Sequence, residues 1–206
     1  MPAGMLGRQL TTTTVGELCG IREYFIKPAD TKIASLPASM AWPEEFARKA
    51  RSLGLPGSFS ASMSDPVTFV AEYRCFSLGG QVVASSAYLI DGKAWDAWDP
   101  SDLPDTSEAA WFASVVAESI APSMPEGWVL DVGRFDSSQW AVVETNSAWS
   151  SNPYCATEGG AEGGAEGVVV TILAAQGDDE DGRFTWQGPE LRRMPVPLPR
   201  RGVVQP

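Results

Sequence analysis

The stretch from Trp128 to Asn146 limits the fold more than any other part of the chain. It reads WVLDVGRF, then DSSQ, then WAVVETN, so two apolar segments of strand length flank a short polar turn. This pattern is typical of an antiparallel β-hairpin. A turn that closes symmetrically between Ser137 and Ser138 places Asp131 directly opposite Glu144. The sequence therefore predicts that two carboxylates face each other across neighbouring strands.

Carboxylates in this arrangement repel each other. Directly opposed side chains have Cβ atoms roughly 5 Å apart, and at that separation the repulsion is on the order of 3 kcal/mol for an effective dielectric near 20. Something positive is therefore expected between them. The two-residue period of a strand adds Asn146 to the same face, and such oxygen ligands suit Mg²⁺ with phosphate oxygens. A one-residue shift of register would instead leave Asp131 and Glu144 as solvated carboxylates on opposite faces.

Length and charge exclude several classes of protein. A chain of 206 residues with 44% hydrophobic residues is long enough for one good-sized domain or two small lobes that share a cleft. The net charge of −11, with no basic cluster before the extreme C-terminus, argues against a nucleic-acid partner and against an anionic membrane surface. No apolar run approaches the roughly 20 residues needed to span a bilayer.

The cysteine and histidine counts narrow the chemistry. Cys19, Cys75 and Cys155 are widely spaced and show no metal-ligand spacing or preceding secretory segment, so we expect reduced thiols in a cytoplasmic protein. The absence of histidine excludes Ser-His and Cys-His catalysis and imidazole zinc sites. Chemistry in this chain must therefore depend on carboxylates, lysine, arginine and a cation.

Two further strands carry candidate site residues. Residues 22–29 (REYFIKPA) are predicted to form a buried strand in which Lys27 either extends to water beside Phe25 or binds phosphate together with Lys32 in the following loop. In the predicted strand 67–76, Glu72 and Arg74 share a face. They form either an exposed ion pair worth under about 1 kcal/mol or a site where the arginine fork grips phosphate or carboxylate oxygens.

The other predicted elements complete an α+β pattern with a mainly antiparallel sheet. Pro43 begins a helix, and residues 33–42 and 57–65 are expected to be loops. Residues 81–88 pair with the strand before them, and a helix through about Ile120 follows a capping pattern at Asp105 and Glu108. Residues 167–176 are expected to be a short helix or an edge strand. The predicted buried stripe of the second helix comprises Trp111, Phe112, Val115, Val116 and Ile120.

The order of the motifs resembles the ATP-grasp superfamily, and within it the clade named for two arginines and a lysine. The motifs are YFIKPADTK (24–32), EYRCF (72–76), GQVVASSAY (80–88), LDVGR (130–134) and WAVVETNSAWSSNPY (140–154). No single motif is specific, but the combination is, and the resemblance covers roughly residues 6–176.

The resemblance implies two small lobes around a nucleotide cleft. Residues 1–66 correspond to a partial N-terminal lid lobe, residues 67–176 to the C-terminal lobe with the metal-binding hairpin, and residues 177–206 to a loosely ordered tail. The implied activity is that of an ATP-dependent carboxylate–amine (or thiol) ligase that forms an acylphosphate intermediate with Mg-ATP. The implied substrates are small-molecule or peptide carboxylates and amines.

The resemblance also implies a role for each candidate residue. Lys27 would hold the α- and β-phosphates, Lys32 would lie on the lid loop, and Glu72 would belong to the nucleotide site. Arg74 would face the γ-phosphate or the substrate carboxylate, so Lys27 and Arg74 are the catalytic candidates. The implied Mg²⁺ ligands are Asp131, Glu144 and Asn146.

Two departures from the clade leave alternatives open. Relatives carry a pre-ATP-grasp domain before the equivalent of residue 6, so we expect that a homodimer or a partner chain supplies it if the chain is active. The clade also tends to have an arginine where this chain has Leu89, and Arg134 is a candidate replacement. The alternatives are a degenerate ATP-grasp module that binds nucleotide without catalysis, and an acidic cytoplasmic interaction domain in which the carboxylates lie on the surface.

Overall fold

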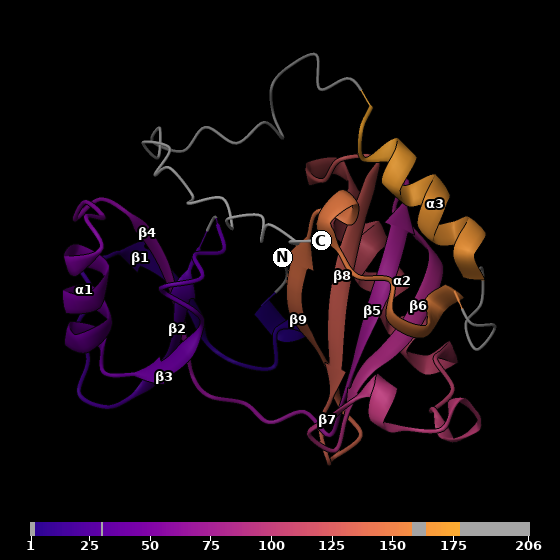
Figure 1. Ribbon diagram of the computed structural model, residues 1–206, viewed down its shortest axis with the longest axis horizontal. Helices are drawn as coiled ribbons and strands as arrows, with labels where there is room; N and C mark the ends of the chain where they lie inside the picture. The colour runs from indigo at the N-terminus through magenta and orange to yellow at the C-terminus, as the bar shows by residue number, and fades with distance from the viewer. Residues whose placement is uncertain (1–2, 30, 158–163, 178–206) are drawn as a thin grey trace, which may run out of the picture.

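Two antiparallel sheets carry the fold (Figure 1). The computed structural model describes residues 3–29, 31–157 and 164–177. The first sheet has the strand order β1-β4-β2-β3, in which every neighbouring pair is antiparallel. Its members are β1 (Leu10–Thr14), β2 (Tyr24–Pro28), β3 (Ser39–Ala41) and β4 (Ser60–Ser64).

Within the described residues, one helix covers the first sheet. Helix α1 (Pro43–Ser52) has proline at its first position, acidic residues in its first turn and basic residues in its last turn, as its dipole favours. Its buried face, including Phe46 and Ala50, packs with Ile26 of β2 and Leu36 in a separate hydrophobic core. The predicted helix is therefore confirmed, and it holds β2 in place.

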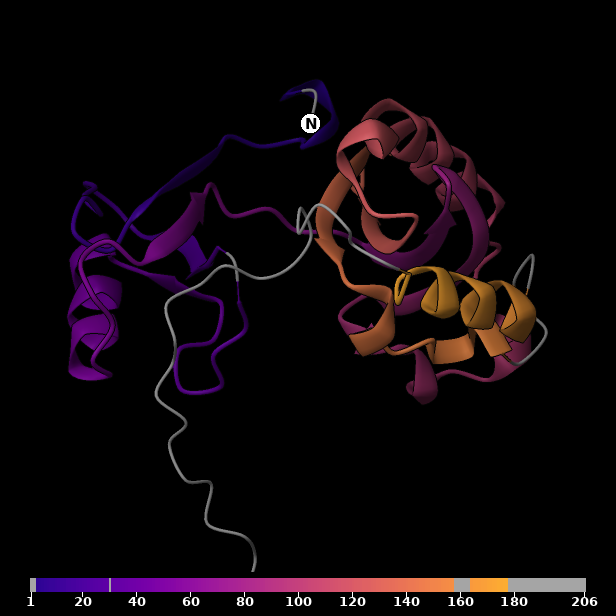
Figure 2. The same ribbon diagram turned by 90° about the horizontal axis from the view of Figure 1, so that it is seen from above.

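The second sheet has the order β7-β6-β5-β8-β9, again antiparallel throughout. Its strands are β5 (Ala71–Leu78), β6 (Gln81–Ile90), β7 (Lys93–Ala94), β8 (Gly127–Arg134) and β9 (Trp140–Asn146). Helices α2 (Ser107–Ile120) and α3 (Gly164–Ala174) cover it (Figure 2). Short 3₁₀ segments are η1 (Ala3–Met5), η2 (Trp95–Ala97), η3 (Pro100–Asp102), η4 (Ala121–Ser123), η5 (Ala148–Ser150) and η6 (Tyr154–Thr157).

The two helices pack on opposite faces of the second sheet. Cys75 and Leu130 face the core that includes the alanines of α2, whereas their neighbours in the chain, Phe76 and Val129, face the core that includes Val168 of α3. This alternation follows from the two-residue period of a strand. The α+β class with antiparallel pairing is confirmed, with the strands divided between two sheets.

Three boundaries differ from the sequence-based expectation. Residues 57–65, expected to be a loop, contain β4, and residues 33–42 contain β3. The β4 sequence SASMS has little intrinsic strand propensity, but its pairing with both β1 and β2 places it inside the sheet, where tertiary contacts override propensity. The strand expected from residue 67 begins at Ala71.

The buried stripe predicted for the second helix was partly wrong. Trp111 is 70% exposed and Val115 is 42% exposed, while Ala109, Ala113 and Ala117 are buried beside Val116. Small side chains allow the helix to lie close to the sheet, as at Gly80, where an added Cβ would lie 2.8 Å from Ala121 Cβ. The prediction from the sequence placed the large hydrophobic side chains in the core. In the structure the helix lies so close to the sheet that alanine side chains fill the contact instead.

Some predictions are only partly covered by the described residues. Residues 167–176 form most of α3 and the turn after it, which decides for the helix. The predicted tail, apart from Gly177, lies outside the described residues. The strands of the first sheet end at Ser64 and those of the second begin at Ala71, but the division into two lobes stays a prediction. Cys19 and Cys75 are free thiols. No helix in the described ranges is long and apolar enough to cross a membrane.

Candidate functional site

A β-bulge places Glu144 opposite Asp131. The turn closes around Ser137, with Phe135 N donating to Gln139 O at 2.8 Å. The ladder then continues through Val132 opposite Val142, and one extra residue of β9 precedes the next pair, Asp131 opposite Glu144. The predicted opposition of the two carboxylates is confirmed, but it arises from a bulge rather than from a turn centred between Ser137 and Ser138.

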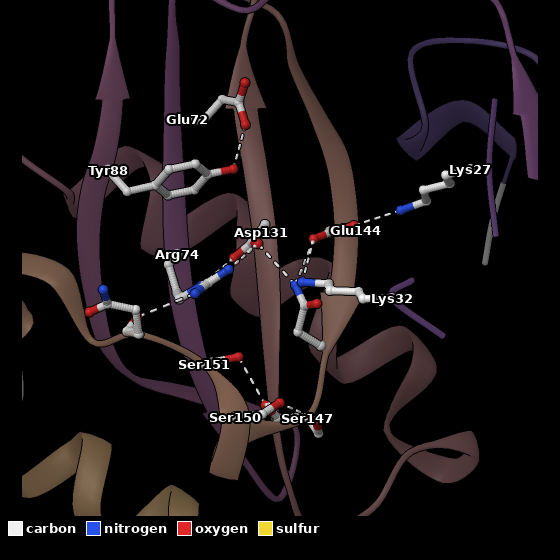
Figure 3. A network of polar contacts seen from close by, with 12 residues as sticks. Lys27, Lys32, Glu72, Arg74, Tyr88, Asp131, Glu144, Ser147, Ser150 and Ser151 are labelled. Atoms are coloured by element: carbon white, nitrogen blue, oxygen red, sulfur yellow. Dashed lines mark hydrogen bonds and ion pairs between the residues drawn. The ribbon is translucent and has the colours of Figure 1, made fainter. Parts of the chain in front are cut away.

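Asp131 forms a buried ion pair with Arg74, its direct neighbour on β5 (Figure 3). Arg74 Nε donates to Oδ1 at 2.8 Å and Nη2 donates to Oδ2 at 2.7 Å, the two-pronged geometry that suits a guanidinium. Arg74 is 6% exposed and Asp131 is 1% exposed. Burial raises the pKa of the Asp131 carboxyl, and the fork from Arg74 opposes this shift.

Two tyrosine rings pack against the guanidinium of Arg74. Its guanidinium carbon lies 4.9 Å from the ring centroid of Tyr154 and 5.6 Å from that of Tyr88, and the two rings stack at 5.1 Å. Arg74 Nη1 also donates to Asn152 O at 3.3 Å. Tyr88 in turn donates a hydrogen bond to Glu72. Glu72 and Arg74 therefore share a face, as predicted, but each has a different partner.

The cations beside Glu144 come from strand β2 of the first sheet and from the segment that follows it. Lys27 Nζ on β2 donates to Glu144 Oε2 at 2.6 Å, and Lys32 Nζ lies 3.7 Å from Oε1 (Figure 3). Partial burial alone would raise the pKa of Glu144, but the hydrogen bond and charge of Lys27, with Asn146, lower it below its usual value. The network thus joins strands that belong to different sheets.

Asn146 links the two carboxylates. Its Nδ2 donates to Asp131 Oδ2 and to Glu144 Oε1, each at 3.0 Å. The expected repulsion is therefore relieved by an amide between the carboxylates and by separate cations beside each, Arg74 for Asp131 and Lys27 for Glu144. The sequence had indicated a positive charge between them.

The donor set fits a magnesium ion that also binds phosphate. Within the described residues no three His, Cys, Asp or Glu side chains are placed to hold a metal. Mg²⁺ commonly takes one or two protein carboxylates and completes its shell with phosphate oxygens and water. Asp131 and Glu144 supply two carboxylates and Asn146 an amide oxygen, so the chemistry of the set suits a metal brought in with a nucleotide.

The comparison with protein families decides the family. The matching family is an ATP-grasp domain, the second family of the clade named for two arginines and a lysine, and it matches residues 5–160 of this chain. The chain belongs to this family. No curated protein sequence gives a significant match.

Solved structures share the ATP-grasp fold of this chain. D-alanine–D-alanine ligase from Bacillus anthracis superposes with a TM-score of 0.51 at 14% identity, covering 84% of this chain and 62% of that one. D-cycloserine synthetase DcsG superposes with a TM-score of 0.50 at 18% identity, covering 83% of this chain and 65% of that one. The chain thus spans less than two thirds of either structure, and identities this low show a common fold alone.

Three residues of the ATP-grasp domain that lie beside the candidate site, Tyr88, Tyr154 and Arg8, were not among the sequence-predicted ones. Tyr88 and Tyr154 both lie in motifs that carried the resemblance, and each ends its motif, so the motifs could have identified them. Arg8 was predicted only as the start of a possible strand over residues 8–13, and nothing near it in the sequence indicates that it hydrogen-bonds to two carbonyls of β9.

Two residues singled out in the sequence lie apart from the main contacts. Lys32 is 81% exposed in its side chain, and its Nζ lies 3.7 Å from Glu144 Oε1. Leu89, which stands where the clade tends to have arginine, pairs with Glu72 in the ladder between β5 and β6. The ATP-grasp domain also has a cavity of about 340 Å³ that contains no predicted site residue; its lining is Pro100, Leu103, Pro104, Asp105, Thr106, Ser107 and Cys155.

Proposed function

We propose that this ATP-grasp domain is the catalytic part of a Mg-ATP-dependent ligase that joins a carboxylate to an amine or a thiol. The observation that carries the proposal is the ion pair between Lys27 of one sheet and Glu144 of the other, beside the buried pair of Arg74 and Asp131. Phosphate would bind the cations of these pairs and Mg²⁺ would bind their carboxylates, so the same groups suit a Mg²⁺–nucleotide. Membership of the ATP-grasp family supports this assignment.

The lysines exchange partners in this proposal. When a Mg²⁺–triphosphate enters, Lys27 releases Glu144 and binds phosphate oxygens, and Lys32 follows from its exposed position. Glu144, Asp131 and the amide oxygen of Asn146 would hold the metal, which would supply positive charge to neutralise the phosphates. Asn146 presents its oxygen by rotating the amide whose nitrogen now contacts both carboxylates.

Arg74 holds Asp131 in place and contributes positive charge. Three hydrogen bonds from Arg74 are found among the described residues, and a guanidinium has five N–H groups. The other two are the ones we assign to the transferred phosphoryl group or to the substrate carboxylate. Glu72, hydrogen-bonded to Tyr88, is assigned to the edge of the nucleotide site.

The proposed chemistry is phosphoryl transfer followed by acyl transfer. An oxygen of the substrate carboxylate attacks the γ-phosphorus of ATP, the bond to ADP breaks, and an acylphosphate forms. The amine or thiol then attacks the acyl carbon, the bond from this carbon to the phosphate oxygen breaks, phosphate leaves with the bonding electron pair, and the nucleophile gives up one proton to the departing phosphate or to water. Such reactions depend on positioning and on neutralisation of developing charge, which lysine, arginine and a metal supply without histidine.

A second candidate is a module that binds nucleotide without turnover. The observation that favours it is the occupation of Arg74 by Asp131 and Asn152, which reduces its freedom to reach a substrate. A partner chain or homodimer that supplies further substrate contacts, and the cytoplasmic location, stay predictions. Small-molecule or peptide carboxylates and amines are the substrates we expect for the ligase.

A thermal-shift titration with ATP and Mg²⁺ tests nucleotide binding. Ligand at about 100 times its dissociation constant should add about 2.7 kcal/mol to the free energy of unfolding, and Glu144→Gln should reduce the shift. No shift at millimolar Mg-ATP would end both nucleotide hypotheses and favour an interaction domain. Release of ADP and phosphate with candidate amino acids or peptides separates the ligase from the non-catalytic module.

A further inference from the structure

One side chain from the N-terminal segment binds two successive carbonyls of β9. Arg8 Nη1 donates to Val142 O at 2.8 Å, and Nη2 donates to Val143 O at 2.9 Å. Successive carbonyls of a regular strand point to opposite edges, so a single guanidinium cannot reach both. They converge here because the bulge between the Val132–Val142 and Asp131–Glu144 pairs turns the backbone.

The bulge decides which face of the sheet Glu144 occupies. Val142 is buried in the core under α2, together with Leu130 and Val132 of β8. Residues two apart on a regular strand share a face, so if this same sequence continued as a regular strand with no bulge, Glu144 would point into this core. The bulge moves Glu144 to the face of Asp131, and Asn146 moves with it.

The position of β9 explains why the bulge needs a partner. Strand β9 is an edge strand of its sheet, so its outward carbonyls depend on other groups for hydrogen bonds. Arg8 is itself fixed, because Nη1 also donates to Leu6 O at 3.1 Å. Gly7 has a φ of +61°, and a Cβ there would lie 2.8 Å from Phe135 and Ala141. The tightly packed turn at Gly7 therefore fixes the position of Arg8 beside β9.

We propose that Arg8 is a positioning residue whose guanidinium holds the β9 bulge and so keeps Glu144 and Asn146 on the face of Asp131. As far as it concerns Mg-ATP affinity, this inference rests on the proposed function. The competing explanation is that Arg8 acts only through its charge: burial lowers the pKa of Arg8, and the nearby charges of Glu72 and Glu144 oppose this shift.

Deletion of Val143 separates the two explanations. Removing this residue restores a regular ladder in which Val132–Val142 is followed directly by Asp131–Glu144, so the correct face no longer depends on a bulge. Arg8→Gln is made in the wild-type chain and in the chain that lacks Val143. Arg22→Gln, which removes an arginine from an exposed ion pair with Asp65, is the matched control. Backbone NOEs of Asp131 report the register, and calorimetry reports the Mg-ATP affinity.

We expect Arg8→Gln in the wild-type chain to lose the NOEs between Asp131 and Glu144 and to weaken Mg-ATP binding by about tenfold or more, as loss of a supporting residue does. In the chain that lacks Val143, the NOEs are retained and Arg8→Gln changes the affinity less than about twofold, because the coupling is gone. Arg22→Gln leaves both quantities unchanged.

Wild-type NOEs in Arg8→Gln, or an equal loss of affinity in both backgrounds, would overturn the proposal. If Arg8→Gln alone does not fold, a folded double variant with the Asp131–Glu144 NOEs supports the proposal and an unfolded one overturns it. If the shortened chain alone does not fold, the NOEs of Arg8→Gln decide. A wild-type chain that binds no Mg-ATP defeats the proposed function, while the NOEs still decide the role of Arg8.

Discussion

Lys27 Nζ on β2 lies 2.6 Å from Glu144 Oε2 on β9, so a cation of one sheet neutralises a carboxylate of the other. Their side chains are 28% and 26% exposed, which leaves both groups accessible to a ligand. An ion pair at such a position contributes little to folding, because solvent screens it. Under the proposed function, the pair serves ligand binding more than stability.

Lys27→Gln tests this explanation. We expect the free energy of unfolding to change by about 1 kcal/mol or less, whereas Mg-ATP affinity should fall by about tenfold or more, since a charge-assisted hydrogen bond to phosphate is lost. Urea unfolding and calorimetry measure the two quantities. Lys49→Gln, at an exposed position near the end of α1, is the matched control. An unchanged affinity in Lys27→Gln would remove Lys27 from the nucleotide site.

Asp131→Asn, in contrast to Lys27→Gln, should strongly destabilise the protein. Removing the charge leaves the buried guanidinium of Arg74 uncompensated, and breaking such a pair costs about 3–5 kcal/mol. Urea unfolding measures the loss, and Asp65→Asn, which breaks the exposed pair with Arg22, should change stability far less. Equal effects of the two substitutions would mean that Asp131 is not held as an ion pair in solution.

The hairpin shows how far local sequence reasoning reached. The opposition of Asp131 and Glu144 was predicted from a turn centred between Ser137 and Ser138. The turn is instead centred on Ser137, and the bulge in β9 restores the pairing. A turn and a bulge that offset each other leave the same pair of residues opposed. Hydrophobic alternation cannot reveal a bulge that is stabilised by Arg8, because this contact spans more than 130 positions of the chain.

The sequence also did not predict which residues the charged side chains pair with. Alternation predicted that Glu72 and Arg74 share a face, but not that Asp131, from a strand that is not consecutive in the chain, would be the partner of Arg74. Local periodicity defines faces, whereas strand order defines neighbours. Motif order supplied the family and hence the set of residues, and the structure supplied their contacts.

Glu72→Gln tests the electrostatics of the site through pH. Burial raises the pKa of Glu72 above its ordinary value of about 4.3, although the hydrogen bond from Tyr88 opposes the shift. The folded state thus binds this proton more tightly than the unfolded state, so the contribution of Glu72 to stability is present below about pH 4 and is lost as the pH rises through the folded pKa.

We therefore expect the stability of wild type minus that of Glu72→Gln to decrease between about pH 4 and pH 7. Urea midpoints measured across this range report the difference. Glu118→Gln, on the exposed side of α2, controls for the loss of one negative charge elsewhere. A difference that rises with pH would show that Glu72 is stabilised as a carboxylate in the folded protein.

Gly167→Ala should destabilise the protein even though alanine favours helices. Gly167 lies in α3, and at an exposed helix position the same change would stabilise by up to about 1 kcal/mol. Here an added Cβ would lie 2.3 Å from Val83 O and 2.8 Å from Val83 C, both backbone atoms of β6 that cannot move aside without disturbing the sheet. Helix α3 would have to lift from the face that it covers, which exposes Val168 and Phe76.

We expect a lower urea midpoint and faster proteolysis within α3, with Val169→Ala, at a position 53% exposed on the same helix, as the control. A stabilised Gly167→Ala variant would mean that α3 does not pack this closely against β6 in solution.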